Sequence, residues 1–132
     1  MDKKELIEHA FKAMENAYAP YSNYHVGSCV ECDDGRYFYG ANIENASYPA
    51  GNCGERSAVF AAYSAGYHKD RIKAIAIVTD GNTVGWPCGI CRQVLTELLD
   101  KETPVYLSNG KEELEVKVSE LLPNAFGPED LQ

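Results

Sequence analysis

The sequence predicts an α/β fold, a three-layer α/β/α sandwich built around a mixed five-stranded sheet. Three observations support this prediction. Apolar residues recur at helical spacing near the N-terminus, and the run "IKAIAIVTD" (72–80) is apolar enough on both faces to be a central strand between two helical layers. The expected elements also follow the order α-β-β-α-β-α-β-β, which is typical of helices packed on both faces of one sheet.

The first half of the chain predicts a helix, a hairpin and a second helix. The first helix is expected over roughly residues 3–18, before Pro20, from the spacing of Ile7, Ala10, Phe11, Met14 and Tyr18. The turn signal Asp33-Asp34-Gly35 lies between "YHVGSCVEC" and "RYFYGAN", which indicates a β-hairpin. The segment "CGERSAVFAAYSAG" (53–66) predicts a short alanine-rich helix with Gly66 as its C-cap.

The second half continues the alternation after the central strand. A helix is expected to begin near Gly89, followed by the strand "PVYLSN" (104–109). Asn109-Gly110 is a turn signal, so "LEVKV" (114–118) is expected to return as an edge strand, and "SELLP" (119–123) adds one helical turn before the tail. Because the chain has no repeat, low-complexity tract or long linker, we expect one domain over residues 1–132.

Composition and charge narrow the class of protein. The 132 residues are 45 % apolar, which suffices for one compact core and is too short for two ordinary domains. A formal net charge of −8, from 12 basic and 20 acidic residues, argues against a nucleic-acid partner, because phosphates are bound largely by lysine and arginine. The chain shows no signal-peptide pattern and no apolar run of about 18 residues, so we expect a cytoplasmic protein with no membrane partner.

Five cysteines, an odd number, favour free thiols, metal binding or catalysis over disulfides in such a chain. Cys88 and Cys91 lie in "WPCGICRQVL" (86–95), where a strand has ended and a helix begins. Cys29 and Cys32 have the same spacing but lie in a predicted strand, where residues three apart point to opposite faces. The alternative is a structural zinc site of four cysteines, but buried thiols are the favoured interpretation for Cys29 and Cys32.

Cys53, in "GNCGERS" (51–57), lies at the start of another predicted helix, where the helix N-terminus favours a thiolate. Three thiols are then expected to meet at the N-termini of two helices. Zinc with three protein ligands keeps a fourth position for water, which marks a catalytic rather than a structural site. The sequence therefore predicts that Cys53, Cys88 and Cys91 bind one Zn²⁺ per subunit.

Glu55 and Arg56 follow Cys53 within one helical turn. Because Cys53 at the cap is not yet helical, its side chain and that of Glu55 can approach one point, where a carboxylate acts as a proton shuttle. Three thiolates make the metal electron-rich, so positive groups must offset their charge. Arg56 and the two helix N-termini are the available compensation, and a solvated helix residue is the alternative for Arg56.

The segments "NIENASYPAGNCGERSA" (42–58) and "PCGICRQV" (87–94) resemble the paired zinc motifs, C-x-E and P-C-x-x-C, of the short, homotetrameric cytidine deaminases. The resemblance runs from "PYSNYHVG" to the tail "LLPNAFGPEDL". It implies a cytidine deaminase-like fold and the zinc-dependent hydrolysis of cytidine and deoxycytidine to uridine and deoxyuridine, with release of ammonia, as in pyrimidine salvage. It further implies that Glu55 acts first as general base and then as general acid.

The resemblance also implies which residues contact the substrate, a free pyrimidine nucleoside. Asn42 and Glu44 match the family positions that hydrogen-bond the ribose hydroxyls. Tyr24 falls where relatives commonly place a phenylalanine against the pyrimidine ring. Outside the family context, these side chains would be interpreted as turn polar residues and a core aromatic.

Three further positions imply that neighbouring subunits share their active sites. Ala46 and Tyr48 resemble the loop that helps to complete a neighbouring site, and Phe126 matches the tail aromatic that reaches a site in another subunit. We therefore expect a homotetramer in which an isolated subunit is poorly active.

Three positions depart from the family pattern: His25, Gly54 and Trp86. We interpret His25 as a surface or packing residue rather than a fourth ligand, and Trp86 leaves the width of the pocket open. Three rival functions are a thioredoxin-like redox protein that uses Cys88 and Cys91 alone, a zinc-stabilised binding module, and a deaminase of the same fold that acts on another aminated nucleoside.

Overall fold

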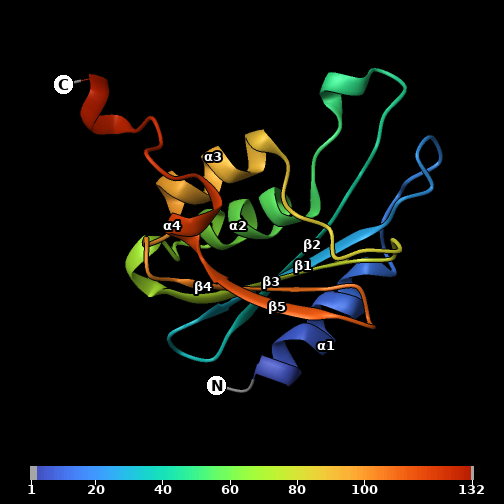
Figure 1. Ribbon diagram of the computed structural model, residues 1–132, viewed down its shortest axis with the longest axis horizontal. Helices are drawn as coiled ribbons and strands as arrows, with labels where there is room; N and C mark the ends of the chain where they lie inside the picture. Colours follow the sequence, from blue (N-terminus) through green and yellow to red (C-terminus); the bar gives the residue numbers. More distant parts are fainter. Residues whose placement is uncertain (1–2, 132) are drawn as a thin grey trace.

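The computed structural model describes residues 3–131 and contains one mixed five-stranded sheet with helices on both faces (Figure 1). The strands follow the order β2-β1-β3-β4-β5 across the sheet. Only β3 and β4 pair in parallel, and the other neighbours are antiparallel. The strands are β1 (Val26–Cys32), β2 (Tyr37–Ala41), β3 (Ile72–Thr79), β4 (Pro104–Ser108) and β5 (Glu113–Lys117). The predicted three-layer sandwich is therefore confirmed.

Helix α1 (Lys3–Met14) covers one face of the sheet, and the other three helices cover the opposite face (Figure 1). These are α2 (Gly54–Ser64), α3 (Gly89–Leu98) and α4 (Val118–Leu121). Short 3₁₀ turns occur at Tyr48–Ala50, Lys69–Arg71 and Pro128–Leu131. Within residues 3–131, no helix combines the length and the apolar character needed to cross a bilayer.

Helix α1 ends earlier than the sequence pattern predicted. The apolar spacing extends to Tyr18, but the last helical residue is Met14. The Tyr18 N–H donates instead to the Asn42 carbonyl, and Tyr18 forms a bridge with Ile43 beyond the end of β2. An extended pairing therefore replaces the last predicted helical turn, and the Tyr18 side chain is exposed rather than part of the core.

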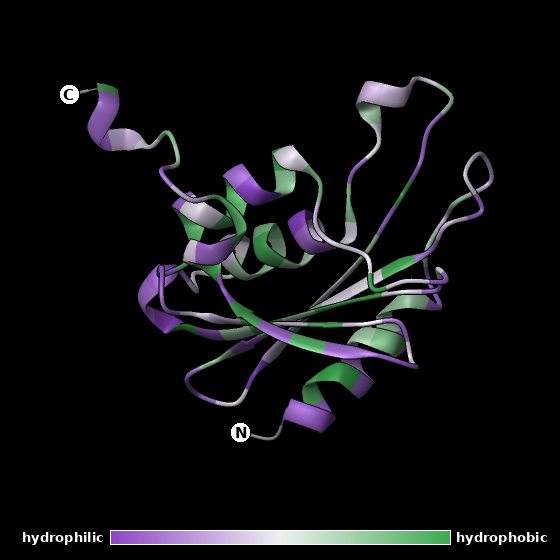
Figure 2. Cartoon of the chain, in the orientation of Figure 1, coloured by the Kyte–Doolittle hydropathy of each residue, from purple (hydrophilic) through white to green (hydrophobic). Residues whose placement is uncertain are grey.

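The sheet separates two hydrophobic clusters, and Figure 2 shows apolar segments of α1 and α2 on opposite sides of it. The larger cluster lies against α2, α3 and α4, and its largest fully buried members are Ile75, Ile77, Leu95, Leu99, Leu107 and Leu121. The smaller cluster lies under α1 and includes Leu6, Ile7, Ala10, Cys29, Ala74, Ala76, Val78 and Tyr106. Because β3 contributes to both clusters, it is the buried central strand that its apolar sequence predicted.

The topology brings the first turns of α2 and α3 to the same edge of the sheet. Strands β2 and β3 are both antiparallel to β1 and so run in the same direction. Helix α2 follows β2 and helix α3 follows β3, so both helices begin beyond the ends of these strands. Gly40 on β2 permits the close approach of α2, because a Cβ there would collide with the backbone of Gly54 and Ala58.

Candidate active site

Three cysteine thiols meet where α2 and α3 begin. Cys53 is the N-cap residue of α2, Cys88 is the N-cap residue of α3, and Cys91 lies in the first turn of α3. The three Sγ atoms lie within 4.8 Å of one another, with 3.9 Å between Cys53 and Cys88 and 3.4 Å between Cys88 and Cys91. The fold thus brings together the three thiols that the sequence selected.

This cluster fits zinc. All three cysteines are free rather than joined in disulfides, and thiolates are among the ligands that zinc prefers. Zinc–sulfur bonds of about 2.3 Å separate two sulfurs of a tetrahedral site by about 3.8 Å, which lies within the range of spacings seen here. Both helix N-termini place positive dipole ends beside the thiols. Cys53, Cys88 and Cys91 are therefore positioned to bind one zinc ion.

Glu55 lies in the first turn of α2 and is almost fully buried, with 4 % of its surface exposed. Burial raises the pKa of its carboxyl to about 7, and a hydrogen bond from the Glu55 backbone N–H offsets part of that rise. A carboxyl group that titrates near neutral pH can both accept and donate a proton. Glu55 therefore has the position and the acidity of a proton shuttle beside the thiol cluster.

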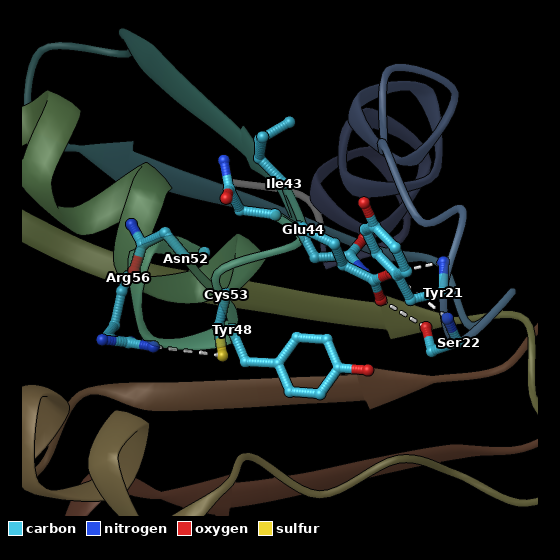
Figure 3. A pocket seen from close by; sticks show the side chains of 11 residues that line it. Tyr21, Ser22, Ile43, Glu44, Tyr48, Asn52, Cys53 and Arg56 are labelled. Atoms are coloured by element: carbon cyan, nitrogen blue, oxygen red, sulfur yellow. Dashed lines mark hydrogen bonds between the residues drawn. The ribbon is translucent and has the colours of Figure 1, made fainter.

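Arg56 contacts the cluster directly instead of projecting into solvent. Its Nη2 donates a hydrogen bond to the Cys53 sulfur at 3.4 Å (Figure 3). Hydrogen bonds from the Cys91 thiol and then from Arg56 lower the pKa of Cys53 to about 5. The pKa of Cys91 is raised, because this thiol donates to Cys53 and is buried. Arg56 is thus placed where it can stabilise negative charge on the Cys53 sulfur, and its role in charge compensation stays a prediction.

A cavity of about 430 Å³ opens beside Cys53 and Arg56 (Figure 3). This volume is within the usual range of small-molecule sites. Its walls come from the turn after α1, the loop after β2 and the first turn of α2. The lining residues are Tyr21, Ser22, Asn42, Ile43, Glu44, Asn45, Tyr48, Gly51, Asn52, Cys53 and Arg56.

The Glu44 carboxylate is held against the cavity wall by the turn at Tyr21 and Ser22 (Figure 3). Its Oε1 accepts hydrogen bonds from the N–H groups of Tyr21 and Ser22 at 3.0 and 3.2 Å, and its Oε2 accepts one from the Ser22 hydroxyl. The Ser22 hydroxyl makes the largest contribution to lowering the pKa of Glu44. Sequence reasoning missed Tyr21 and Ser22, because these contacts join segments more than 20 residues apart.

Asn42 lines the cavity but is itself largely buried, and its amide holds the start of β1. Its Oδ1 accepts from the Val26 N–H at 2.9 Å, and its Nδ2 donates to the Tyr24 carbonyl at 2.8 Å. The Tyr24 side chain is outside the cavity lining and packs on the loop after β3. A Cβ on Gly81 or Gly85 would collide with the Tyr24 ring or its hydroxyl.

The three residues expected to serve neighbouring subunits are all exposed. Tyr48 lines the cavity and is 76 % exposed, whereas Ala46 lies outside the lining. Phe126 is 57 % exposed and borders a second cavity between α3, α4 and the C-terminal segment. The Phe126 carbonyl accepts a hydrogen bond from Gln93 Nε2 at 2.8 Å, which ties this segment to α3.

Cys29 and Cys32 take no part in the thiol cluster. Both are buried in β1, with Cys29 in the hydrophobic cluster under α1 and Cys32 in the cluster on the opposite face. The structure therefore excludes the four-cysteine site and confirms the interpretation of these residues as buried thiols.

Two of the positions that depart from the family pattern have partners outside the thiol cluster. His25 Nδ1 lies 2.6 Å from Asp80 Oδ2, and the His25 N–H donates to Asp80 Oδ1 at 2.9 Å. The Trp86 ring is about half exposed, with its centroid 5.8 Å from the Arg92 guanidinium carbon. His25 is thus a packing residue rather than a fourth ligand, as expected.

Comparison with known proteins identifies the family. The family model described as the cytidine and deoxycytidylate deaminase zinc-binding region matches residues 1–107. The chain belongs to this deaminase family. Over 132 residues it is 49 % identical to the cytidine deaminase of Halalkalibacterium halodurans, covering 99 % of this chain and 98 % of that protein. It is 46 % identical to that of Sporosarcina psychrophila, covering 99 % and 96 %.

Solved structures of cytidine deaminases share the fold. The enzyme from Burkholderia pseudomallei superposes with a TM-score of 0.91 at 44 % identity, covering 96 % of this chain and 100 % of that one. The enzyme from Mycobacterium tuberculosis gives 0.80 at 37 % identity, covering 96 % and 98 %. The resemblance seen in the paired motifs is confirmed. The interpretations as a thioredoxin-like redox protein or a zinc-stabilised binding module are set aside.

Proposed function

We propose that this deaminase hydrolyses cytidine and deoxycytidine to uridine and deoxyuridine, releasing ammonia in pyrimidine salvage. The observation that carries the proposal is the buried Glu55 beside three converging thiols, next to a cavity large enough for a small molecule. The cytidine deaminases among its relatives support the same reaction. Zinc held by Cys53, Cys88 and Cys91 would supply a Lewis acid that makes a water molecule nucleophilic near neutral pH.

Glu55 carries the protons of this reaction. Its carboxylate takes a proton from the attacking water and delivers it to N3 of the cytosine ring as the water oxygen bonds to C4. It then transfers the second proton of that water to the amino group on C4, so that the C4–N bond breaks, ammonia leaves and the C4 carbonyl of uridine remains. Because Glu55 is buried, bulk water does not compete for these protons.

Arg56 offsets the charge of the thiolates. Three thiolate ligands donate more electron density than neutral ligands would and so weaken the metal as an electrophile. The Arg56 guanidinium, which donates a hydrogen bond to Cys53, and the two helix N-termini offset part of the negative charge of the thiolates. Arg56 would therefore raise the electrophilicity of a zinc ion held by the three cysteines without itself binding the ion.

The cavity wall suits a free nucleoside better than a nucleotide. In our proposal, the Glu44 carboxylate accepts a hydrogen bond from a ribose hydroxyl and the Asn42 amide donates one. The Tyr24 side chain lies outside the cavity lining in this structure, so its proposed contact with the pyrimidine ring requires it to turn from the loop after β3 toward the cavity. Of the described lining residues, Arg56 is the one cation, and it is already engaged by Cys53. A monophosphate would thus find no free cationic partner and would face the fixed carboxylate of Glu44.

We further propose a cytoplasmic homotetramer with one zinc ion per subunit and shared active sites, each subunit forming one catalytic domain over residues 1–132. The exposure of the aromatic side chains of Tyr48 and Phe126 supports this assembly, because large apolar groups that project from a subunit commonly mark an interface. The segment that carries Tyr48 projects from the body of the subunit (Figure 1). Light scattering that finds a fully active monomer would contradict the proposal.

The function is tested by following the ultraviolet absorbance of cytidine, deoxycytidine, cytosine and the two nucleoside monophosphates with purified protein. We expect turnover of both nucleosides and little or none of the free base or the monophosphates. Deamination restricted to a monophosphate, or to another aminated nucleoside, would refute the substrate assignment. Chelation should stop turnover, and added zinc should restore it.

A further inference from the structure

We propose that Arg92 is a positioning residue of the metal centre, which holds the segment presenting Cys88 and joins it to α4. The inference rests on the proposed function only in taking Cys53, Cys88 and Cys91 as the zinc ligands. Arg92 follows Cys91 in α3, but its contacts lie elsewhere. Its Nε donates a hydrogen bond to the Pro87 carbonyl at 2.7 Å, and its Nη1 donates to the Leu121 carbonyl at 2.9 Å.

The two ligands on α3 differ in how firmly the fold holds them. Cys91 is buried within the first helical turn. Cys88 is exposed, has an extended backbone and makes no capping hydrogen bond with its side chain. It is preceded by residues 80–87, which contain neither helix nor strand. The Cys88 carbonyl accepts the first hydrogen bond of the helix, from the Arg92 N–H at 2.9 Å. The helix therefore fixes the backbone on the C-terminal side of Cys88, and contacts of the neighbouring loop must fix it on the other side.

Pro87 is the point at which that loop can be held next to Cys88. Proline has no N–H group, so its carbonyl is the backbone group available for a hydrogen bond. Arg92 engages that carbonyl, and its guanidinium carbon lies 5.8 Å from the centroid of the Trp86 ring. One side chain thus contacts both residues that lead into the exposed ligand.

The second hydrogen bond anchors this contact to the body of the subunit. Leu121 is the last residue of α4, where helix carbonyls lack partners within the helix and favour a cation. A guanidinium is planar and charged at all relevant pH values, so its fork of donors can bridge the two carbonyls in a fixed geometry. A lysine ammonium at the same position lacks that fork. The bridge fixes Cys88 relative to α3 and α4 together.

Gln93 provides a matched control for this proposal. It is the next residue of α3, and its Nε2 donates to the Phe126 carbonyl at 2.8 Å. Arg92 ties α3 to α4 and Gln93 ties α3 to the segment after α4, but the hydrogen bond to Pro87 comes from Arg92. Substituting Gln93 loosens the C-terminal segment without releasing the residue before Cys88.

The test compares Arg92→Ala, Arg92→Lys and Gln93→Ala with the wild-type protein. Zinc dissociation constants are measured by competition with a chromophoric chelator, and the visible absorption bands of the cobalt-substituted proteins report the geometry of the thiolate site. We expect both Arg92 variants to bind zinc about 10- to 100-fold more weakly and to have altered cobalt bands. Gln93→Ala should keep its zinc affinity within about twofold of the wild type.

Arg92→Lys decides the question if Arg92→Ala does not fold. Wild-type zinc affinity and cobalt bands in Arg92→Lys would overturn the proposal. An equal loss of zinc affinity in Gln93→Ala would also overturn it, because the effect would then come from the C-terminal segment as a whole. A wild-type protein that binds zinc in this Arg92-dependent way but leaves cytidine unchanged would refute the proposed function and uphold the role of Arg92.

Discussion

Cys29–Cys32 and Cys88–Cys91 have the same C-x-x-C spacing, but they lie in different kinds of element. The first pair is in β1, where alternation sends the two thiols into the cores on opposite faces of the sheet. The second pair spans the start of α3, where the N-cap residue and the third helical residue present their sulfurs 3.4 Å apart. The same spacing therefore separates two thiols in one region and brings two together in the other.

The chemistry of the thiols follows their surroundings. Burial raises the pKa of Cys29 to about 12 and that of Cys32 to about 11, so both stay protonated and inert. At the start of α2, hydrogen bonds from Cys91 and Arg56 lower the pKa of Cys53 to about 5. The C-x-x-C pair at α3 thus joins a metal site because a third thiol, Cys53, lies beside it at the start of α2 with Arg56 as its cationic partner, and the spacing alone does not predict this.

The largest effect, loss of the metal itself, should appear when one cysteine in each region is replaced. Cys88→Ala removes one of three ligands, so zinc affinity should fall by at least about 100-fold and stability should fall with it, because metal binding is coupled to folding. Cys32→Ala removes one buried sulfur, which should cost about 1 kcal/mol of unfolding free energy and leave zinc content unchanged. Metal analysis and urea unfolding of both variants measure the difference. If Cys32→Ala also lost zinc, the contrast between the two regions would fail.

The next effect, in a Glu55 variant, distinguishes a residue that binds the metal from one that takes part in the reaction. Glu55→Gln should retain zinc and the fold, because Glu55 is beside the thiols without being a fourth ligand. Turnover of cytidine should fall by about 10²–10⁴-fold or more, since one group serves both the attacking water and the leaving amine. Zinc content and kcat are measured on the same preparation. Loss of zinc from this variant would make Glu55 a ligand, and normal turnover would remove it from the mechanism.

A smaller effect is expected from the cation beside Cys53. Arg56→Ala should leave the thiolate charge uncompensated and cost about 1–3 kcal/mol of transition-state stabilisation, or about 5- to 150-fold in kcat/KM. Arg56→Lys keeps the charge but not the reach of the guanidinium, so it should recover part of the loss. Unchanged kcat and zinc content in Arg56→Ala would return this side chain to the role of an ordinary helix residue.

The order and the layers of the fold could be predicted from local patterns. The apolar run at 72–80 and the turn signals at Asp33-Asp34-Gly35 and Asn109-Gly110 each report their own segment. The end of α1 could not be predicted in this way. Apolar spacing continued to Tyr18, but the Asn42 carbonyl, which is distant in sequence, takes the Tyr18 N–H. Such a contact depends on the tertiary structure and leaves no signal near Tyr18 itself.

The candidate site also contains residues that local sequence predicts and contacts that only the tertiary structure shows. The thiols and Glu55 could be predicted because each lies at or within two residues of a helix start, where residue type and position carry the chemistry. The contacts of Ser22 with Glu44 and of Tyr24 with Gly85 join separate loops, so no spacing rule indicated them. The positions of the thiols and of Glu55 could therefore be predicted from the sequence, whereas the loop contacts that surround them could not.

The smallest predicted effect returns to the thiols of β1 and appears in the pH dependence of stability. A thiol whose pKa is raised in the folded state keeps its proton while the unfolded chain loses it, so stability falls as pH rises. For Cys29 and Cys32 the decline should begin near the ordinary value of 9.0 and continue to about 11–12. At pH 10 each thiol should cost about 1 kcal/mol of unfolding free energy relative to pH 8.

Urea unfolding of the zinc-loaded wild type and of the Cys29→Ala/Cys32→Ala variant at both pH values isolates the contribution of these two thiols. Tyr37 and the other groups that titrate in this range are common to both proteins. The variant should lose less stability than the wild type over this interval. Equal losses would mean that the β1 thiols ionise as freely in the fold as in the unfolded chain. The contrast in pKa between these thiols and Cys53 would then fail.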